Sequence, residues 1–295
     1  MTVIRAGKEP EETRGAMVRS TVALMALIVS VLFSACTNSE FEGFTFSVMS
    51  YNIGNFELAH TTADKIAAEI SKHGIPDVLF LQDMPWAISI EDLSLHTGLP
   101  YFIEGQALIR RHHIGILSRF PLRNQDVLSF PGVNQRPAII CAEATLGDSE
   151  TLICSLHLQS PSNEVRRVEQ SDGVNITGRL RLFWDELFGE TQRSRSVDQL
   201  LAWIDAKQPG SVVVGGDFNS FQLSRPIRTM STGFNDAFWP SWSYFQGTYN
   251  GLGFLIKPRL DYIFHSRGIV SLDAKVLTET PGNHFPIRAL LRMPD

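Results

Sequence analysis

The sequence has little cysteine, no excess of positive charge and no hydrophobic run long enough to cross a bilayer. Three of its 295 residues are cysteine, and one of these lies near the N-terminus. Lysine and arginine number 26 against 31 aspartate and glutamate residues, which gives a formal charge of −5. A protein that coats nucleic acid needs a cationic excess, so that class is excluded, whereas a nuclease that makes a few local contacts is not. Internal repeats and low-complexity tracts are also absent from the sequence.

The longest apolar run, Thr21 to Ala35, follows a basic region that contains Lys8, Arg14 and Arg19, and it ends at Cys36. It is shorter than the roughly 20 residues that a membrane span needs, but it suits a secretory signal. The segment Leu32-Phe33-Ser34-Ala35-Cys36 resembles a bacterial lipobox, in which the cysteine is lipidated and becomes the new N-terminus. We therefore expect a lipoprotein signal peptide over residues 1–36. The alternative is an ordinary signal peptide with an incidental cysteine.

The same resemblance implies an exported protein that is lipid-anchored to the bacterial envelope. Thr37, rather than aspartate, follows the cysteine, which favours the outer membrane. Residues 37–44 form a short tether in this interpretation, and residues 45–295 form one domain because no linker composition divides them.

The domain alternates strand-like apolar runs with helical patterns. Residues 62–72 have apolar positions at helical spacing, and Thr62 is available as the N-cap. Residues 179–206 show a second helical pattern, and residues 159–178 are polar enough for a surface loop. Residues 112–122 predict a strand closed by a proline-containing turn. A final strand hairpin is predicted over roughly 259–265 and 286–292.

Cys141 and Cys154 lie on two apolar runs, 137–146 and 151–158, that flank the turn at Gly147-Asp148-Ser149-Glu150. A hairpin register centred on that turn places the two cysteines diagonally rather than opposite each other. We interpret them as small buried hydrophobic residues in preference to a disulfide.

Short polar motifs end or follow most of the apolar runs. They are Ser50-Tyr51-Asn52-Ile53-Gly54-Asn55-Phe56, Leu81-Gln82-Asp83, Ser155-Leu156-His157, Gly216-Asp217-Phe218-Asn219, Leu260-Asp261-Tyr262 and Gly282-Asn283-His284. In α/β proteins the ends of core strands are places where side chains converge on a substrate. Carboxylates, amides and imidazoles delivered in this way suit a divalent metal and a phosphate.

Asp217 and Asn219 follow two glycines that let the backbone turn sharply. A carboxylate there could take a proton from water, while the amide could donate to a phosphate oxygen. Asp83 and Asn52 offer hard oxygen ligands of the kind that Mg²⁺ binds. Ordinary turn chemistry for Asp217 and helix capping for Asp83 are the alternatives.

Two imidazoles, His157 and His284, occur near these motifs. A histidine beside a carboxylate has its charged form favoured, which suits a group that stabilises a negatively charged transition state. Asp261 is an acid within a strand and needs a partner if it is buried, and we choose His284 as that partner. A structural role is the alternative for each histidine.

Together and in this order, the motifs resemble the endonuclease/exonuclease/phosphatase superfamily of deoxyribonuclease I-like, metal-dependent phosphodiesterases. The resemblance covers about residues 45–292. It implies an α/β four-layer sandwich, with two mixed β-sheets face to face and helices outside. It also implies a divalent cofactor, Mg²⁺ with Mn²⁺ or Ca²⁺ as alternatives, and a monomeric enzyme.

Carried over to this sequence, the resemblance implies a role for each motif residue. Asn52, Asp83 and Asn283 would form the metal site. Asp217 would activate water, Asn219 would hold the phosphate, and Asp261 would pair with His284. His157 would contact the scissile phosphate or the leaving group. Arg136 occupies the place of a phosphate-facing arginine, with an exposed arginine as the alternative.

Two residues depart from the family pattern, because Asp83 replaces a glutamate and Asn283 replaces an aspartate. A catalytically weakened or inactive relative that binds a ligand at the surface, through the 159–178 loop, is therefore the alternative function.

The substrate stays open among a nucleic acid, a phospholipid head group and a small phosphoester. The basic residues that could favour a nucleic acid are Arg110, Arg111, His112, His113, Arg166, Arg167, Arg179 and Arg181. The run Phe238-Trp239-Pro240-Ser241-Trp242 could provide an apolar wedge for a lipid, or it could be core.

Overall fold

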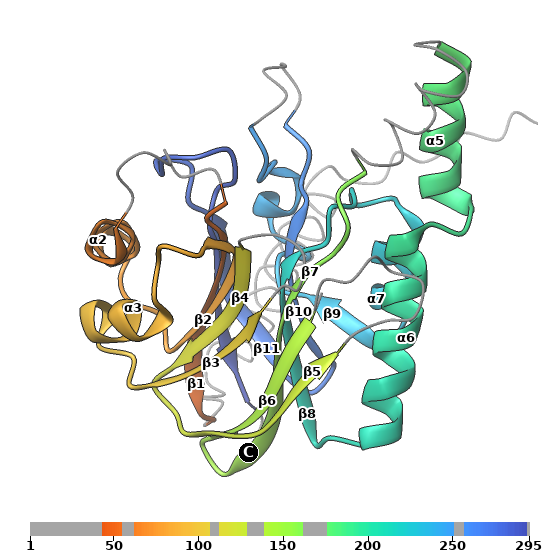
Figure 1. Ribbon diagram of the computed structural model, residues 1–295. Coiled ribbons are helices and arrows are strands. Elements are labelled where there is room, and N and C mark those ends of the chain that lie inside the picture. Colours follow the sequence, from red (N-terminus) through yellow and green to blue (C-terminus); the bar gives the residue numbers. More distant parts are fainter. Residues whose placement is uncertain are drawn as a thin grey trace, which may run out of the picture. The chain divides into compact units, whose positions relative to one another are not determined.

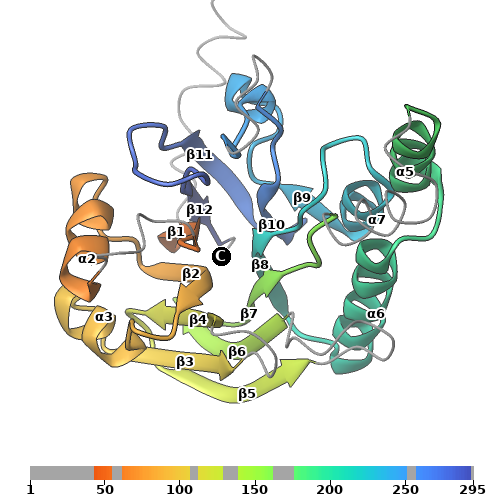
Figure 2. The same cartoon turned by 45° about the horizontal axis from the view of Figure 1, so that its top comes forward.

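Two six-stranded sheets pack face to face in the computed structural model, which describes residues 43–54, 62–106, 112–128, 139–161, 176–250 and 257–293. Figures 1 and 2 show the two sheets and the helices that cover their outer faces. Gly43–Asp295 forms one compact unit.

The first sheet is mixed, because β1 and β2 run parallel while their other partners are antiparallel. Its strand order is β11 (Val270–Val276), β12 (Ile287–Arg292), β1 (Thr45–Asn52), β2 (Val78–Pro85), β4 (His112–Ser118) and β3 (Tyr101–Gln106).

The second sheet is also mixed, with β7 and β8 as its parallel pair. Its strand order is β5 (Leu122–Leu128), β6 (Ile139–Leu146), β7 (Ser149–His157), β8 (Ser211–Asp217), β10 (Asp261–Ser266) and β9 (Phe234–Asp236). The parallel pairs β1–β2 and β7–β8 lie in the middle of their sheets, and their C-terminal ends carry the polar motifs.

Alternation along the strands divides the apolar side chains into three layers. Val48 and Val213 point into the space between the sheets. On the outer face of the first sheet, Met49 packs with α2 (Ala63–Lys72) and α3 (Ile90–Thr97). On the outer face of the second sheet, Val214 packs with α6 (Gln192–Lys207) and α7 (Arg225–Gly233). The predicted four-layer sandwich is therefore confirmed.

The remaining helices of the described residues are α5 (Ile176–Phe188) and the short 3₁₀ helix η1 (Trp242–Phe245). The helical pattern predicted over 179–206 is divided between α5 and α6, because Thr191 begins α6 with a capping box that includes Ser194. Among the helices that the structure describes, none is both long enough and apolar enough to cross a bilayer.

The predicted final hairpin is wrong. β10 belongs to the second sheet, where it pairs with β8 and β9, whereas β12 belongs to the first sheet, where it pairs with β1 and β11. The apolar pattern identified both strands but carries no information on their partners. The strand β11 between them, which sequence reasoning missed, pairs with β12.

The interpretation of the two cysteines is also wrong, because Cys141 and Cys154 form a disulfide. The hairpin turn is tighter than expected: Leu146 pairs with Ser149, so only Gly147 and Asp148 lie between the strands. This register places the cysteines directly opposite each other, with their Cα atoms 4.1 Å apart.

The sheets approach closely at Gly215 of β8, two residues before Asp217. A Cβ atom at position 215 would lie 2.3 Å from the Phe80 ring of β2, in the opposite sheet. Only glycine fits there without a shift of one of the sheets. This close approach lets side chains of the first sheet reach Asp217 in the second.

We expect Gly215→Ala to lower the free energy of unfolding by about 1–3 kcal/mol, because the added methyl group overpacks the layer between the sheets. Urea denaturation measures the change. Gly233→Ala is the matched control, since a Cβ there meets no heavy atom within 4 Å. Equal stability of the two variants would contradict the role given to Gly215.

Candidate active site

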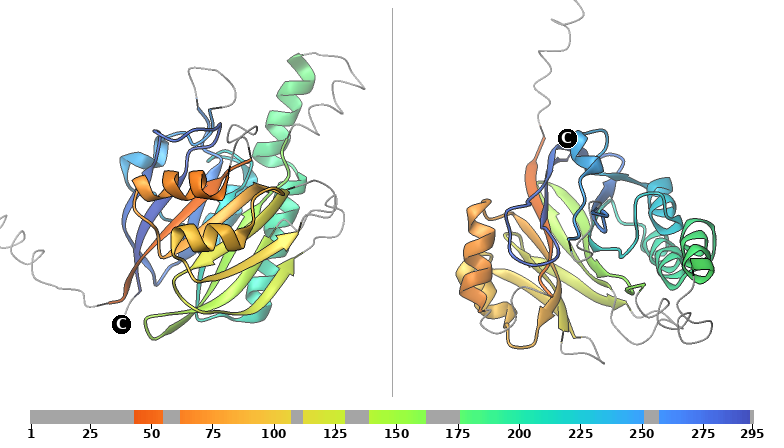
Figure 3. Two further views of the ribbon diagram at one scale, coloured as in Figure 1. Left: turned by 60° about the vertical axis from the view of Figure 1, so that its left-hand side comes forward. Right: turned by 90° about the horizontal axis from the view of Figure 1, so that it is seen from above.

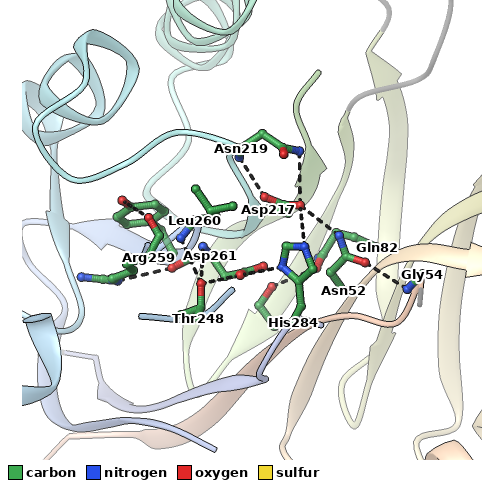
Figure 4. Close-up of polar contacts among 12 residues, drawn as sticks. Asn52, Gly54, Gln82, Asp217, Asn219, Thr248, Arg259, Leu260, Asp261 and His284 are labelled. Atoms are coloured by element: carbon green, nitrogen blue, oxygen red, sulfur yellow. Dashed lines mark hydrogen bonds and ion pairs between the residues drawn. The ribbon is translucent and has the colours of Figure 1, made fainter. Parts of the chain in front are cut away.

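Three of the motif residues lie on one row of the second sheet. In the strand register, His157 of β7 and Asp261 of β10 are both direct partners of Asp217 on β8. In the first sheet, Asn52 pairs with Gln82, the residue before Asp83. Because both parallel strand pairs end at the same level, the two sheets deliver their polar side chains to one place (Figure 4).

Asp217 is at the centre of this group and is almost fully buried, with 1% of its surface exposed. Its Oδ2 accepts a hydrogen bond from Asn52 Nδ2 at 2.9 Å and one from Asn219 Nδ2 at 3.2 Å. Its Oδ1 accepts from the Asn219 backbone N–H at 2.8 Å. The carboxylate is therefore fixed by donors from both sheets.

His284 lies between two buried carboxylates. Its Nδ1 is 3.0 Å from Asp261 Oδ2, and its Nε2 is 3.7 Å from Asp217 Oδ2. The predicted pair of Asp261 and His284 is thus present. Tyr249 pairs with His284 in an isolated bridge, and its ring centroid is 4.8 Å from that of the imidazole.

Burial and neighbouring charges shift the pKa values of both Asp217 and His284. Burial raises the pKa of the Asp217 carboxyl, and His284 opposes that rise. For His284, burial by itself lowers the pKa, but the charges of Asp261 and Asp217 outweigh it and raise the pKa to about 9. His284 is therefore an imidazolium at neutral pH.

Asp83 leaves the β2 ladder at a bulge. The register between β2 and β4 shifts between Leu81 and Met84, and Asp83 has a φ of 52°, which is uncommon for a residue other than glycine. The bulge turns its carboxylate toward His157, whose Nδ1 is 3.5 Å from Asp83 Oδ1. The other ring nitrogen of His157, Nε2, is 3.5 Å from Asp217 Oδ2.

Asn52 and Asp83 place side-chain oxygen atoms around the backbone of Gly54, and we name this pair the Asn52–Asp83 cradle. The Gly54 N–H donates to Asn52 Oδ1 at 3.0 Å, and a Cβ atom at position 54 would lie 2.6 Å from Asp83 Oδ2. The Asp83 carboxylate is partly exposed, and the carbonyl oxygen of Asn52 has a second lone pair. These hard oxygen donors fit a divalent cation such as Mg²⁺.

Asp217, Asp261 and His284 form another group whose ligand atoms lie within 4.8 Å of one another, close enough to hold a metal ion. Both ring nitrogens of His284 already face carboxylates. The two carboxylates are therefore better suited to hold the imidazolium of His284 than a metal ion.

Two polar residues that support the site were missed by sequence reasoning. Thr248 donates its hydroxyl to Asp261 Oδ2 at 2.6 Å and accepts from the backbone N–H of Leu260 and Asp261. Buried Gln82 accepts from Ser50 and donates to Ser155 of the second sheet, which joins the two sheets below Asp83. Gln82 is part of the Leu81-Gln82-Asp83 motif, but no sequence signal marks Thr248.

The remaining predicted site residues have less distinctive positions. Asn219 Nδ2 donates to Leu158 O at 2.9 Å as well as to Asp217, so its phosphate contact stays a prediction. The Asn283 side chain is half-buried beside His284, and its backbone carbonyl accepts from Asn250 N–H. Arg136 and Cys36 lie outside the described residues.

The residues considered for substrate choice differ in their exposure and in their partners. His113 is largely buried and lies 2.6 Å from Glu104 Oε1, whereas Arg181 is exposed and lies 3.9 Å from Asp185. Phe238 is core, whereas Trp239 and Trp242 are exposed. Arg110, Arg111, Arg166 and Arg167 lie outside the described residues.

Comparison with known proteins gives a family match over most of the chain. A model described as Endonuclease/Exonuclease/phosphatase family matches residues 49–284. No curated protein matches the sequence.

Solved structures with the same fold include an endonuclease/exonuclease/phosphatase from Beutenbergia cavernae, with a TM-score of 0.63 at 16% identity over 85% of this chain and 72% of that one. Truncated Caenorhabditis elegans TDP2 gives 0.60 at 21% identity over 86% and 100%. D. rerio TDP2 complexed with single strand DNA product gives 0.62 at 15% identity over 84% and 98%. At these identities the likeness concerns the fold.

We expect the pairing of His284 with Asp261 to make stability depend on pH in the metal-free protein. The folded-state pKa of about 9 lies above the ordinary value of 6.5, so the stabilisation is complete below pH 6.5 and is lost as the pH rises through 9. Asp261→Asn should remove most of it, on the order of 3 kcal/mol. Urea denaturation in a chelator between pH 6 and 10 measures the difference.

The control for this experiment is Asp236→Asn, which removes a buried carboxylate paired with Arg259 instead of His284. It should destabilise the protein without changing the slope between pH 6.5 and 9. Parallel pH profiles for wild type and Asp261→Asn would show that the pair does not titrate as described.

Proposed function

We propose that this chain, which belongs to the Endonuclease/Exonuclease/phosphatase family, is a metal-dependent phosphodiesterase that uses a water activated by Asp217. Family membership makes it a phosphoester hydrolase of the nuclease and phosphatase type. The observation that carries the finer proposal is the convergence of Asp217, His284 and His157 with the Asn52–Asp83 cradle.

Asp217 is suited to accept the proton of the attacking water. Burial raises its pKa toward neutral pH, which makes it a stronger base than an exposed aspartate. Asn52 and Asn219 hold the carboxylate in one orientation, so little reorganisation is needed when the proton moves.

The two histidines would serve the phosphate. His284, held as an imidazolium by Asp261, would stabilise negative charge that develops on the phosphate oxygens. His157, between Asp83 and Asp217, would contact the scissile phosphate or the leaving oxygen. Asn219 would contact the phosphate once it exchanges one of its internal hydrogen bonds.

Asp83 and Asn52 would hold the metal ion, with Asn283 as a further oxygen ligand. Mg²⁺ is the proposed ion, with Mn²⁺ or Ca²⁺ as alternatives. When bound, such an ion supplies Lewis-acid polarisation of a phosphoryl oxygen.

The alternative function, a weakened or inactive relative that binds a surface ligand, rests on Asp83 and Asn283. Asp83 is one methylene shorter than glutamate, and neutral Asn283 supplies no charge. Isothermal titration with Mg²⁺ and Mn²⁺, beside an assay with bis(p-nitrophenyl) phosphate, separates the two functions. Metal binding with metal-stimulated turnover supports the enzyme. Absence of both metal binding and turnover supports the ligand-binding protein.

We expect Asp217→Asn to lower kcat for bis(p-nitrophenyl) phosphate by about 10²–10⁴-fold, because the amide cannot accept the proton. The control is Asp126→Asn, which changes a carboxylate of β5 that pairs with Lys207 away from the site. Addition of EDTA to the wild type should abolish turnover. Retained turnover in Asp217→Asn would remove Asp217 from the role of base.

The lipid anchor at Cys36 and export to the envelope, with the outer membrane favoured, remain part of the proposal. The Cys141–Cys154 disulfide supports export, since disulfides persist in oxidising compartments such as the periplasm.

We expect cells that express the full chain to incorporate a labelled fatty acid into the protein, and Cys36→Ala to abolish the label. Cys141→Ala provides the control, because a buried disulfide cysteine cannot be lipidated. Label that survives Cys36→Ala would refute the anchor.

A further inference from the structure

Helix α5 presents its apolar face to solvent. Its apolar residues recur at the spacing of a single helix face, which we name the α5 stripe: Leu180, Phe183, Trp184, Leu187 and Phe188. Four of these side chains are exposed, from 49% for Phe183 to 64% for Phe188. An apolar stripe on a helix normally faces the core, so this exposure needs an explanation.

The opposite side of α5 shows why the stripe faces outward. Glu186 is buried there and forms an ion pair with buried Arg193 at 2.5 Å. Ser220 donates to Glu186 at 2.6 Å, and Arg193 donates to the Gln159 carbonyl at 3.1 Å. Because a buried charge without its partner is costly, this network fixes the rotation of the helix about its axis.

The same network places the α5 stripe beside the active site. Ser220 directly follows Asn219 on the loop after β8, and Gln159 lies two residues after His157. Figures 1 and 3 show α5 projecting beyond the body of the domain, at the end where β7 finishes.

A cation lies within this apolar surface. The Arg228 guanidinium is 5.6 Å from the centroid of the Phe188 ring and donates to the carbonyls of Leu187 and exposed Leu223. Among the described residues, Arg228 has no carboxylate within ion-pair distance. Its charge is complementary to a phosphate group.

A second exposed aromatic cluster surrounds η1. Trp239, Trp242 and Phe245 are 63%, 90% and 71% exposed. Tyr244, which contacts the rings of Trp239 and Phe245, accepts hydrogen bonds at its carbonyl from Gln222 and Arg259. Gln222 lies three residues after Asn219, and Arg259 lies two residues before Asp261.

We propose that the α5 stripe and Arg228 dock on a phospholipid bilayer and that the substrate is a phosphodiester of a phospholipid head group at that surface. Tryptophan, phenylalanine and leucine on one helix face are typical of a helix that lies in a membrane interface, where arginine meets lipid phosphate. The substrate assignment rests on the proposed function, whereas the docking surface does not.

Single-stranded nucleic acid is the competing occupant, and the composition of the stripe disfavours it. Phe183 already stacks on Phe221, and Trp184 stacks on Phe188, so a base could reach only one face of each ring. The leucines of the stripe offer no stacking surface for a base, whereas they add to the apolar area that a bilayer can bury.

The test uses residues 37–295, which include the whole compact unit, so that neither a lipid nor the apolar run Thr21 to Ala35 contributes to binding. In this background, Trp184→Glu with Phe188→Glu is compared with Leu95→Glu, which adds charge at an 80% exposed leucine of α3. The first readout is co-sedimentation with vesicles of phosphatidylcholine and phosphatidylglycerol. The second is the ratio of vesicle phospholipid hydrolysis to bis(p-nitrophenyl) phosphate hydrolysis.

We expect the α5 variant to lose vesicle affinity by about tenfold or more and to lower the hydrolysis ratio by a similar factor. Each glutamate puts a charge in place of apolar area that the bilayer would bury. Leu95→Glu should change neither readout. Arg228→Gln, which leaves the stripe apolar, should weaken binding to a smaller extent.

Equal vesicle binding of the α5 variant and Leu95→Glu would overturn the docking surface. Loss of single-stranded DNA binding with unchanged vesicle binding would overturn it in favour of nucleic acid. If bis(p-nitrophenyl) phosphate is not hydrolysed by any variant, the proposed function fails, and the substrate assignment fails with it. Co-sedimentation still decides the docking surface in that case.

Discussion

The hydrogen bond from Asn52 to Asp217 is the contact on which the rest of the site depends, because it joins the end of a first-sheet strand to the buried carboxylate of the second sheet. It forms only where the sheets come close, and Gly215 permits that approach against Phe80. The bond brings the side-chain oxygen atoms of Asn52 and Asp83 in the first sheet to the row of His157, Asp217 and Asp261 in the second. Gln82 and Ser155 add another polar link between the sheets.

Buried charge at this junction has to be balanced, and the balance determines the chemistry. Asp217 and Asp261 are both almost fully buried, and one imidazolium, His284, lies between them. Thr248 reduces the cost at Asp261 by donating to the same oxygen that His284 contacts. The arrangement keeps His284 charged and leaves Asp217 with a raised pKa, so an electrostatic stabiliser and a base occur side by side. Such opposed shifts are characteristic of sites that move protons.

The sequence predicted the sandwich and the residues that meet in the site, because polar motifs after apolar strands are local signals. It could not predict properties that depend on partners distant in the chain. β10 and β12 both have clear strand patterns, yet their partners lie in different sheets. The strand register that places Cys141 opposite Cys154 depends on a hairpin turn that is two residues shorter than the expected one. Thr248 has no motif, since its role arises only when its loop folds back on Leu260. For α5, periodicity predicted a helix, but Glu186 and Arg193 decided which face is buried.

The N-terminal end of the domain and the catalytic end are separated by the length of β1. Its eight residues from Thr45 to Asn52 span about 25 Å at the usual rise of a strand. Asn52 lies in the site, so the chain enters the domain at the end away from it. The α5 stripe lies at the site's own end, and Glu186 holds it there through Ser220 and Arg193, which contact the loops that follow Asp217 and His157. Docking of the stripe on a bilayer would therefore bring the site itself to the lipid surface.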